Sequence, residues 1–296
     1  MKPAMDYVGR IFRPPSEARS LLLQVTIGCS HNRCTYCDMY RDKRFSAKPW
    51  DVVQRDIAEA SAMGPGHFKR VFLCDGDALI LSTSKLRRIL EAIKQQMPWV
   101  ERVGVYGDTR SVGRKTIEEL TALRQAGLGI VYHGMETGSD AVLEHIDKGG
   151  TRQEAIATAE KLRQAGIAHS VMVLLGVGGR RFSAAHARDT GTALSAMNPD
   201  YIGVLTTTVV PGTPLHEEQA QGRFELPGQF ELLEELRTIV AGLDVSDCRF
   251  SCNHASNYLP LTAPLPDGRE ALLKLLDKVL KERRLDWLKP EYLRGL

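Results

Sequence analysis

The sequence lacks any apolar run long enough to cross a membrane as a helix. A spanning helix needs about 18 or more consecutive apolar residues, and no run in these 296 residues approaches that length. The first residues, MKPAMDYVGR, also lack the apolar stretch and the small-residue cleavage site of a signal peptide. We therefore expect a protein that works in the cytoplasm and has no membrane partner.

A large charge of one sign is also absent. The chain has 39 Lys and Arg residues against 36 Asp and Glu residues, which gives a formal net charge of +3. So small a charge does not favour a nucleic acid over other partners. Hydrophobic residues make up 43% and charged residues 25% of the chain. These shares are typical of a globular domain and exclude a disordered chain or a coiled coil.

Cysteine is scarce, but its placement is informative. Six cysteines in a chain of this length in a reducing compartment point to a metal or catalytic site instead of a disulfide framework. Three of them, Cys29, Cys34 and Cys37, lie within the segment GCSHNRCTYC. Thiolates are preferred ligands of zinc and of iron–sulfur clusters. A structural zinc site needs a fourth ligand, for which His31 is available, whereas a four-iron cluster on three cysteines leaves one iron open.

Apolar runs and helical patterns alternate along the first two thirds of the chain. The runs suit buried parallel strands, and the intervening segments 115–126 and 152–165 place apolar residues on one helical stripe. A complete eight-unit barrel uses about 250 residues, or roughly 31 per unit, so residues 21–215 have room for about six units. The sequence therefore predicts an α/β fold, a partial six-unit TIM-like barrel. The predicted strands are 21–27, 70–74, 102–106, 129–133, 168–175 and 201–207.

Residues outside this core are predicted to form two smaller parts. Residues 1–20 suit an extended N-terminal arm, and residues 216–296 suit a small, mainly helical cap with helices over 229–241 and 270–284 and an irregular segment over 247–267. The irregular segment carries Cys248 and Cys252, which can bind a second metal, donate hydrogen to a substrate or pack in the fold. We take Cys252 and His254 as candidate catalytic residues and Asn257 as a candidate pocket residue.

The cysteine segment resembles the radical S-adenosylmethionine (SAM) superfamily. The usual motif of that family is CxxxCxxC, placed after the first barrel strand, with an aromatic residue before the last cysteine. Tyr36 takes the aromatic position, while the first gap here is four residues instead of three. The resemblance implies a [4Fe–4S] cluster on Cys29, Cys34 and Cys37, whose open iron chelates SAM. It further implies reductive cleavage of SAM, hydrogen abstraction from a substrate by the 5′-deoxyadenosyl radical, and an electron donor such as flavodoxin or ferredoxin.

Motifs at the ends of later strands extend the resemblance. Residues 75–77 are similar to the GlyGlyGlu motif of the family, in which a carboxylate accepts hydrogen bonds from the SAM ammonium and glycine permits close approach. The alternative is a solvated Asp-Gly turn. The segments HGMETGSD and IDKG resemble the elongator, methylthiotransferase and coproporphyrinogen-oxidase branch, and the cap segment CRFSCNHASNY resembles a bacterial branch of the superfamily. The implied cofactor-binding residues are Tyr36, Asp75, Gly76, Asp77, Glu136, Lys148, Gly176 and Gly178.

The remaining alternatives concern one motif, the function and the substrate. Asp108 and Arg110 either contact the ligand or cap the next helix. The alternative function is a non-redox zinc-binding structural or nucleic-acid-binding protein, which needs a fourth ligand and a basic face. We expect no appended RNA-binding, acetyltransferase or cobalamin domain. The substrate prediction therefore stays open between a small molecule, a tetrapyrrole and an RNA.

Overall fold

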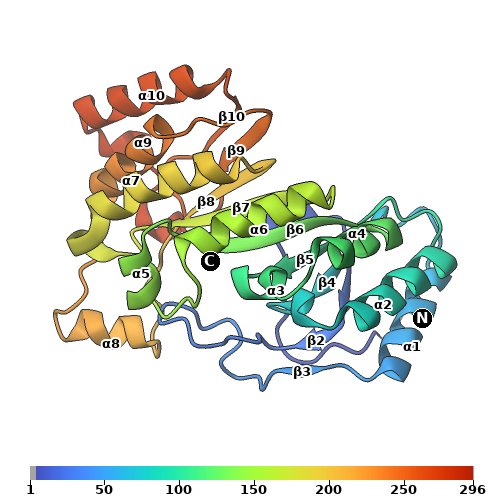
Figure 1. Cartoon of the computed structure of the whole chain (residues 1–296). Helices are drawn as coiled ribbons and strands as arrows, with labels where there is room; N and C mark the ends of the chain where they lie inside the picture. Colours follow the sequence, from blue (N-terminus) through green and yellow to red (C-terminus); the bar gives the residue numbers. More distant parts are fainter. Residues whose placement is uncertain (1–4, 296) are drawn as a thin grey trace. The chain divides into compact units, whose positions relative to one another are not determined.

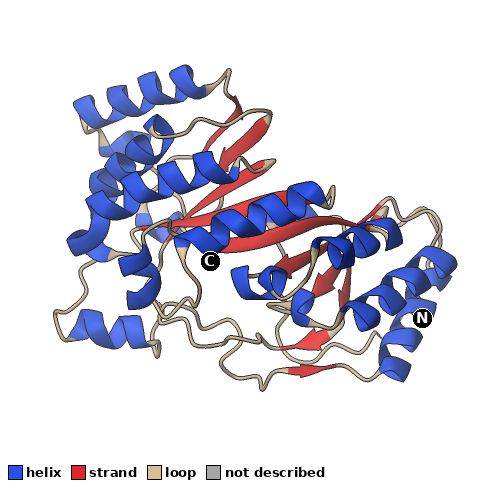
Figure 2. Cartoon of the chain, viewed as in Figure 1, coloured by secondary structure: helices blue, strands red, loops and turns tan. Residues whose placement is uncertain are grey.

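A computed structural model describes residues 5–295, so the first four residues of the predicted arm and the last residue of the predicted cap lie outside the described chain (Figure 1). Strands and helices alternate along most of its length (Figure 2). Two strands, β2 (Thr26–Ile27) and β3 (Ser46–Ala47), form a small antiparallel pair. The larger sheet of the described residues has the order β1 (Leu21–Gln24), β4 (Arg70–Cys74), β5 (Arg102–Gly107), β6 (Leu128–Glu136), β7 (Ala168–Leu175), β8 (Tyr201–Thr206), β9 (Cys248–Cys252) and β10 (Leu261–Leu265).

The chain divides into two compact units, which we describe separately. The first contains the residues up to Asn32 together with 39–133 and 160–169. Strands β1, β4, β5 and β6 pair in parallel there, with Leu23 opposite Leu73 and Leu73 opposite Val105. These side chains pack with apolar residues of the neighbouring helices in one core. The helices of this unit include α1 (Trp50–Ala62), η2 (Ala78–Ile80), α2 (Thr83–Gln96), α3 (Thr109–Gly113) and α4 (Ile117–Ala126), and the short turn η1 (Pro15–Glu17) precedes β1.

Local sequence explains where helix α4 begins and ends. Thr116 accepts a hydrogen bond from the Glu119 backbone, and the Glu119 side chain accepts one from the Thr116 backbone. This reciprocal capping box satisfies two amide groups that the first turn of a helix leaves without partners. Gly127 ends the helix with a φ of 121°, a backbone conformation that glycine adopts without steric strain. The helix then leads directly into β6.

The second unit contains residues 33–38, 134–159 and 170 onward. Strand β8 pairs in parallel with both β7 and β9, while β10 pairs antiparallel with β9. Apolar residues of three helices, such as Leu194, Leu236 and Leu276, pack with Val173 and Phe250 of the strands in one core. The helices are α5 (Asp140–His145), α7 (Gly179–Met197), α8 (Pro214–Ala220), α9 (Gln229–Ala241), α10 (Arg269–Glu282), η3 (Leu285–Trp287) and η4 (Glu291–Leu293), and α6 (Arg152–Gln164) runs through both units.

Five of the six predicted strands are present as single strands, and the first, 21–27, is divided into β1 and β2, which belong to different sheets. The prediction of an irregular segment over 247–267 was wrong. That segment contains β9 and β10. Alternate residues of β9, Cys248, Phe250 and Cys252, lie in the core, which is the period of two that a half-buried strand requires. Pro264 is tolerated in β10 because that strand is at the edge of the sheet, where a missing N–H breaks no ladder. The division into arm, core and cap stays a prediction.

None of the helices between residues 5 and 295 combines the length and the apolar character needed to cross a membrane.

Candidate functional site

The cysteine loop, residues 28–37, follows strand β2. Cys29 belongs to the first unit, whereas Cys34 and Cys37 belong to the second, and all three side chains are partly exposed. Within either unit, the described residues contain no group of three His, Cys, Asp or Glu side chains that is placed to hold a metal ion. We therefore describe the surroundings of the loop one unit at a time.

In the second unit, three of the predicted cofactor residues come together. The Tyr36 hydroxyl is hydrogen-bonded to the Glu136 carboxylate, and Lys148 Nζ donates to Glu136 Oε1 at 2.8 Å. Burial, followed by the negative charge of Glu136 and the nearby Cys34 and Cys37, raises the pKa of Tyr36 well above its usual value. The phenol therefore stays protonated and acts as a hydrogen-bond donor. Tyr36, Glu136 and Lys148 thus form one hydrogen-bonded group, and their cofactor-binding roles stay predictions.

Two backbone features shape this group. Glu136 ends β6 with a φ of 67°, a region that residues other than glycine rarely occupy and that is enriched at functional sites. Gly134 lies on the same face of the strand, two residues earlier. A Cβ atom at Gly134 would lie closer than 3.0 Å to the Glu136 carboxylate and 3.2 Å from Lys148 Nζ. Sequence reasoning missed Gly134, although a glycine two positions before an acidic strand end is a visible signal.

In the first unit, the buried Asp75 carboxylate is bound by the protein itself. Its Oδ2 atom accepts hydrogen bonds from Gly28 N at 2.9 Å, Gln24 Nε2 at 2.9 Å and Lys43 Nζ at 3.0 Å. Its side chain is fully buried. We conclude that Asp75 holds chain segments together, which argues against its predicted role as a SAM ligand. Sequence reasoning missed Gln24 and Lys43.

Asp77 differs from Asp75 in its bonded partners. It is also buried, but its Oδ2 accepts from Ser30 Oγ at 2.5 Å instead of from a lysine, while Oδ1 of each aspartate has no hydrogen-bond partner among the described residues. Burial, followed by repulsion from Asp108, raises the pKa of Asp77 to about 7. Asp77 is bonded to Ser30, the residue that follows Cys29. Its unpartnered oxygen is suited to accept a hydrogen bond from a cationic donor.

Gly76, between the two aspartates, lies against the cysteine loop. A Cβ atom there would be 2.6 Å from the Tyr40 ring and 3.0 Å from Cys29 Cβ. Glycine is therefore required for this close approach to Tyr40 and Cys29, while the predicted approach of Gly76 to SAM stays a prediction. The nearby Asp108 forms a capping box with Ser111 at the start of α3, and Arg110 donates two hydrogen bonds to Asp108 Oδ2. Helix capping, one of the two alternatives for Asp108, is thus observed.

The predicted cofactor contact of Gly176, at the end of β7, does not fit the geometry of its backbone. Its N–H donates to Glu235 Oε2 at 2.7 Å, and its carbonyl accepts from Gly179 N at 3.0 Å. Both backbone groups therefore already have protein partners. Gly178 is the residue before α7, and a Cβ atom there would be 3.0 Å from both Val142 and Phe182.

Glu235 belongs to a buried polar network that sequence reasoning did not find. Burial raises the pKa of Glu235 to about 7 and lowers the pKa of His186, 3.8 Å away, to about 4. His186 Nδ1 is also hydrogen-bonded to Thr137 Oγ1 at 2.8 Å. The network thereby connects the residue after Glu136 with Gly176 at the end of β7.

The candidate residues of the cap lie in two environments. Cys252 is 1% exposed in the apolar core, where burial raises its thiol pKa to about 12, and Cys248 has a similarly raised pKa. A buried, protonated thiol is a poor nucleophile and a poor metal ligand, which argues against a catalytic role for Cys252 and a metal site at this pair. His254 Nδ1 contacts Ser256 Oγ at 2.9 Å, and Asn257 joins two groups of β8, Thr206 Oγ1 and the Val204 carbonyl.

Residues 23–189, more than half of the chain, match the family model described as the radical SAM superfamily. The chain belongs to the radical SAM superfamily. This superfamily uses a [4Fe–4S] cluster and SAM, which confirms both predicted cofactors. The predicted α/β class is confirmed by the same match and by the solved structures below, which share the fold.

Individual relatives of this radical SAM chain are distant. It is 23% identical over 224 residues to the heme chaperone HemW of Bacillus subtilis (strain 168), covering 73% of this chain and 58% of that protein. It is 29% identical over 216 residues to the biotin synthase of Caulobacter vibrioides (strain NA1000 / CB15N), covering 71% of this chain and 60% of that protein. The chain therefore spans about three fifths of the length of these relatives.

Solved structures share the fold. Coproporphyrinogen III oxidase (HemN) from Escherichia coli superposes with a TM-score of 0.55 at 15% identity, over 75% of this chain and 51% of that chain. Methylornithine synthase (PylB) gives a TM-score of 0.54 at 15% identity, over 76% of this chain and 63% of that chain. At these identities the likeness concerns the fold alone.

Proposed function

We propose that this radical SAM protein cleaves SAM reductively at a [4Fe–4S] cluster on Cys29, Cys34 and Cys37, and abstracts hydrogen from a substrate. The observation that supports the proposal is the set of polar and charged side chains next to the cysteine loop in each unit. Asp77, with an unused buried oxygen, lies by Ser30, and the bonded group of Tyr36, Glu136 and Lys148 lies by the other two cysteines. When bound, the cluster supplies the electron that cleaves SAM.

The donor set of the loop fits such a cluster. Three thiols are the ligand type that iron–sulfur clusters use, and three ligands leave one of four irons open. A structural zinc site would need a fourth protein ligand. Membership of the radical SAM superfamily favours the iron–sulfur cluster over that zinc alternative.

The carboxylates around the loop suit the charged groups of SAM. Ionising Asp77 is costly because its side chain is buried and Asp108 is close. A bound ammonium group would offset that cost, so we assign the SAM amino group to Asp77 in preference to Asp75. Glu136 retains acceptor capacity beyond its bonds from Tyr36 and Lys148 and is proposed to bind amino or ribose hydroxyl groups. The Lys148 ammonium is proposed to pair with the SAM carboxylate.

The partners in this proposal include a reductant and a substrate. Radical SAM enzymes need a reductant, for which we propose a flavodoxin or a ferredoxin in the cytoplasm. The names of the relatives, a heme chaperone and a biotin synthase, point to different molecules. A small molecule, a tetrapyrrole and an RNA therefore stay as substrate predictions. Metabolite comparison of a deletion strain grown without oxygen separates them.

Metal analysis tests the proposed cofactor. We expect protein reconstituted without oxygen to contain about four irons per chain and to give the EPR signal of a reduced cluster with dithionite. Adding SAM should then release 5′-deoxyadenosine. Tetrahedral zinc with no cleavage of SAM is the result that would overturn the proposal.

A further inference from the structure

We propose that Lys43 and Gln24 are positioning residues for the cysteine loop, acting through Asp75 to couple that loop to the N-terminal segment 6–10. This segment is called the tether below. The proposal rests on the proposed function where it concerns the cluster. The contacts that support it, however, belong to the protein alone and lie within the first unit.

One buried oxygen joins three parts of the chain. Asp75 Oδ2 accepts hydrogen bonds from Gly28 N, which precedes Cys29, from Gln24 of β1, and from the ammonium group of Lys43. The Lys43 side chain is 4% exposed and that of Asp75 is 0% exposed. Charge-assisted hydrogen bonds in a buried setting are strong, and removing one partner leaves the others uncompensated. The backbone beside Cys29 therefore depends on this oxygen.

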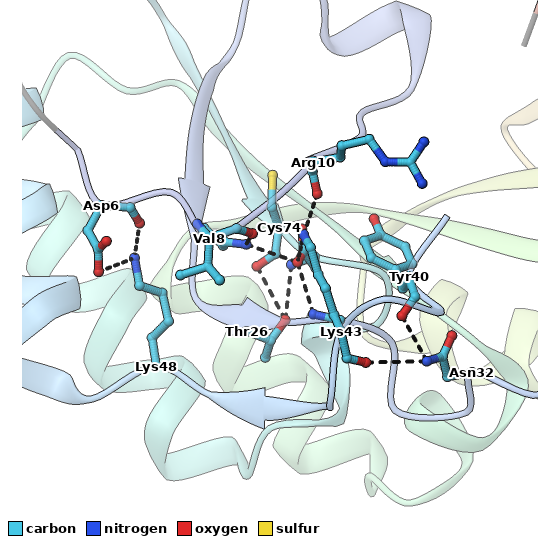
Figure 3. Close-up of polar contacts among 12 residues, drawn as sticks. Asp6, Val8, Arg10, Thr26, Asn32, Tyr40, Lys43, Lys48 and Cys74 are labelled. Carbon is cyan, nitrogen blue, oxygen red and sulfur yellow. Dashed lines mark hydrogen bonds and ion pairs between the residues drawn. The ribbon is translucent and has the colours of Figure 1, made fainter. Parts of the chain in front are cut away.

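Two of these three partners of Asp75, Gln24 and Lys43, also bind the tether. Gln24 Oε1 accepts from Val8 N at 2.8 Å, and Gln24 Nε2 donates to the Val8 carbonyl at 3.2 Å. Lys43 Nζ donates to the Arg10 carbonyl (Figure 3). Gln24 and Lys43 thus each bond to the tether and to Asp75 at the same time. A shift of the tether should therefore disturb the bonds to Asp75, and a shift of Asp75 should disturb those to the tether.

Packing adds an independent observation, because the Lys43 stem lies between two glycines. Gly9 of the tether and Gly28 of the loop have φ angles of +64° and +77°. A Cβ atom on Gly9 would be 2.7 Å from Lys43 Cε, and one on Gly28 would be 3.2 Å from Lys43 Cβ. Asn32 Nδ2 of the loop donates to the carbonyls of Tyr40 and Lys43, at 2.9 and 3.4 Å. The turn at 40–43 therefore holds the loop at two points.

A second anchor of the tether provides an internal control. Lys48 donates to the Asp6 carbonyl and pairs with Asp56 Oδ2 at 3.0 Å, while Asp6 N donates to Asp56 Oδ1 at 3.0 Å. Lys48 is as buried as Lys43, with a side chain 1% exposed. Its partners in these contacts belong to the tether and to α1. The two lysines are thus matched in residue type, burial and attachment to the tether, but differ in their connection to Asp75.

Coupling between two sites is reciprocal. If Asp75 transmits it, fixing the loop by loading a cluster should also order Val8, and loosening Lys43 should loosen Gly28. Lys48 should not affect Gly28.

Amide hydrogen exchange of the metal-free full chain tests the coupling directly, since Val8, Gly28 and Asp6 each donate a backbone N–H in these contacts. We expect Lys43→Met to speed exchange at Val8 and Gly28 by about tenfold or more, with Asp6 changed by less than about twofold. Lys48→Met should instead speed exchange at Asp6 and leave Val8 and Gly28 nearly unchanged. Equal acceleration at all three amides, or none at Gly28, would overturn the proposal. Asp75→Asn, which keeps the size of the side chain, is the second variant.

Cluster measurements give a further readout. We expect Lys43→Met to retain less iron than Lys48→Met after identical reconstitution. Its cluster should also have a more negative midpoint potential, because a buried positive charge near the loop has been removed. Equal iron and equal potential in the two variants contradict the positioning role. If the wild-type chain takes up no cluster, the proposed function fails, while the exchange experiment still decides the coupling.

Discussion

Replacing Gly134 by alanine tests the group formed by Tyr36, Glu136 and Lys148. The added Cβ would come closer than 3.0 Å to the Glu136 carboxylate, a separation that real Cβ atoms essentially never show, and within 3.2 Å of Lys148 Nζ. The carboxylate must therefore move, although Lys148 holds it at 2.8 Å. No residue that is proposed to contact SAM is itself replaced.

The size of the effect follows from the contact that is lost. A hydrogen bond to a charged group contributes about 1.5–3 kcal/mol, and every 1.4 kcal/mol corresponds to about tenfold in affinity. If Glu136 binds SAM from its present position, the variant should bind SAM about 10- to 150-fold more weakly. Its thermal unfolding should change little, because the clash involves the tip of a side chain and no backbone.

The assay is equilibrium binding of SAM to reconstituted protein, with iron content measured in the same samples. Gly66→Ala is the matched control, because a Cβ atom at Gly66 has no neighbour within 4 Å. SAM affinity unchanged in Gly134→Ala at equal iron content would refute the role of Glu136. Equal loss in both variants would show an effect of the alanine substitution itself.

Three further predictions concern other residues. Cys34→Ala should lose nearly all iron after reconstitution, while Cys252→Ala, in the apolar core, keeps it; equal iron in both would refute the assigned ligands. Asp77, with a pKa of about 7, should bind the SAM ammonium only when ionised. SAM affinity should then fall as the pH drops below 7, by up to about tenfold per unit, and Asp77→Asn should abolish that slope in binding measurements from pH 6 to 8. Glu235 has a folded-state pKa of about 7, above its ordinary 4.5. The folded chain therefore holds the carboxyl proton of Glu235 more firmly than the unfolded chain, and the wild type loses stability as the pH rises from 4.5 to about 7. Glu235→Gln should gain on the order of 3 kcal/mol over the wild type between pH 5 and 8 in urea unfolding, and parallel curves for the two proteins would contradict this.

The strands of the core were largely predictable because each is a short apolar run between polar or glycine-rich segments. Strands β4 and β7 begin and end at the predicted residues. Strand β9 was missed because its buried positions alternate with Arg249 and Ser251, and because prolines follow it. The alternation of buried and exposed residues predicts a strand, but the prolines that follow favoured the prediction of an irregular segment.

The residues of the hydrogen-bonded group in the second unit could be singled out from short motifs, since Tyr36, Glu136 and Lys148 each belong to one. The partners of Asp75 could not. Lys43 stands among charged residues in the run RDKR, and such a run usually indicates a solvated surface. Its burial depends on contacts with Gly9 and Asp75 that no local pattern encodes.

The two aspartates of the DGD motif show the same limit. They are identical in type, both buried and two residues apart, and each keeps one oxygen without a hydrogen-bond partner among the described residues, yet Lys43 binds Asp75 whereas Ser30 binds Asp77. Sequence assigned both to SAM. The difference arises from which side chains reach each carboxylate, and that is set only in the folded chain.

Release of 5′-deoxyadenosine tests the central claim most directly. Anaerobically reconstituted chain, dithionite and SAM should yield 5′-deoxyadenosine in proportion to the iron bound, and Cys37→Ala should yield none under the same conditions. An iron-loaded chain that binds SAM without releasing 5′-deoxyadenosine, or a Cys37→Ala variant that releases as much as the wild type, would contradict the account.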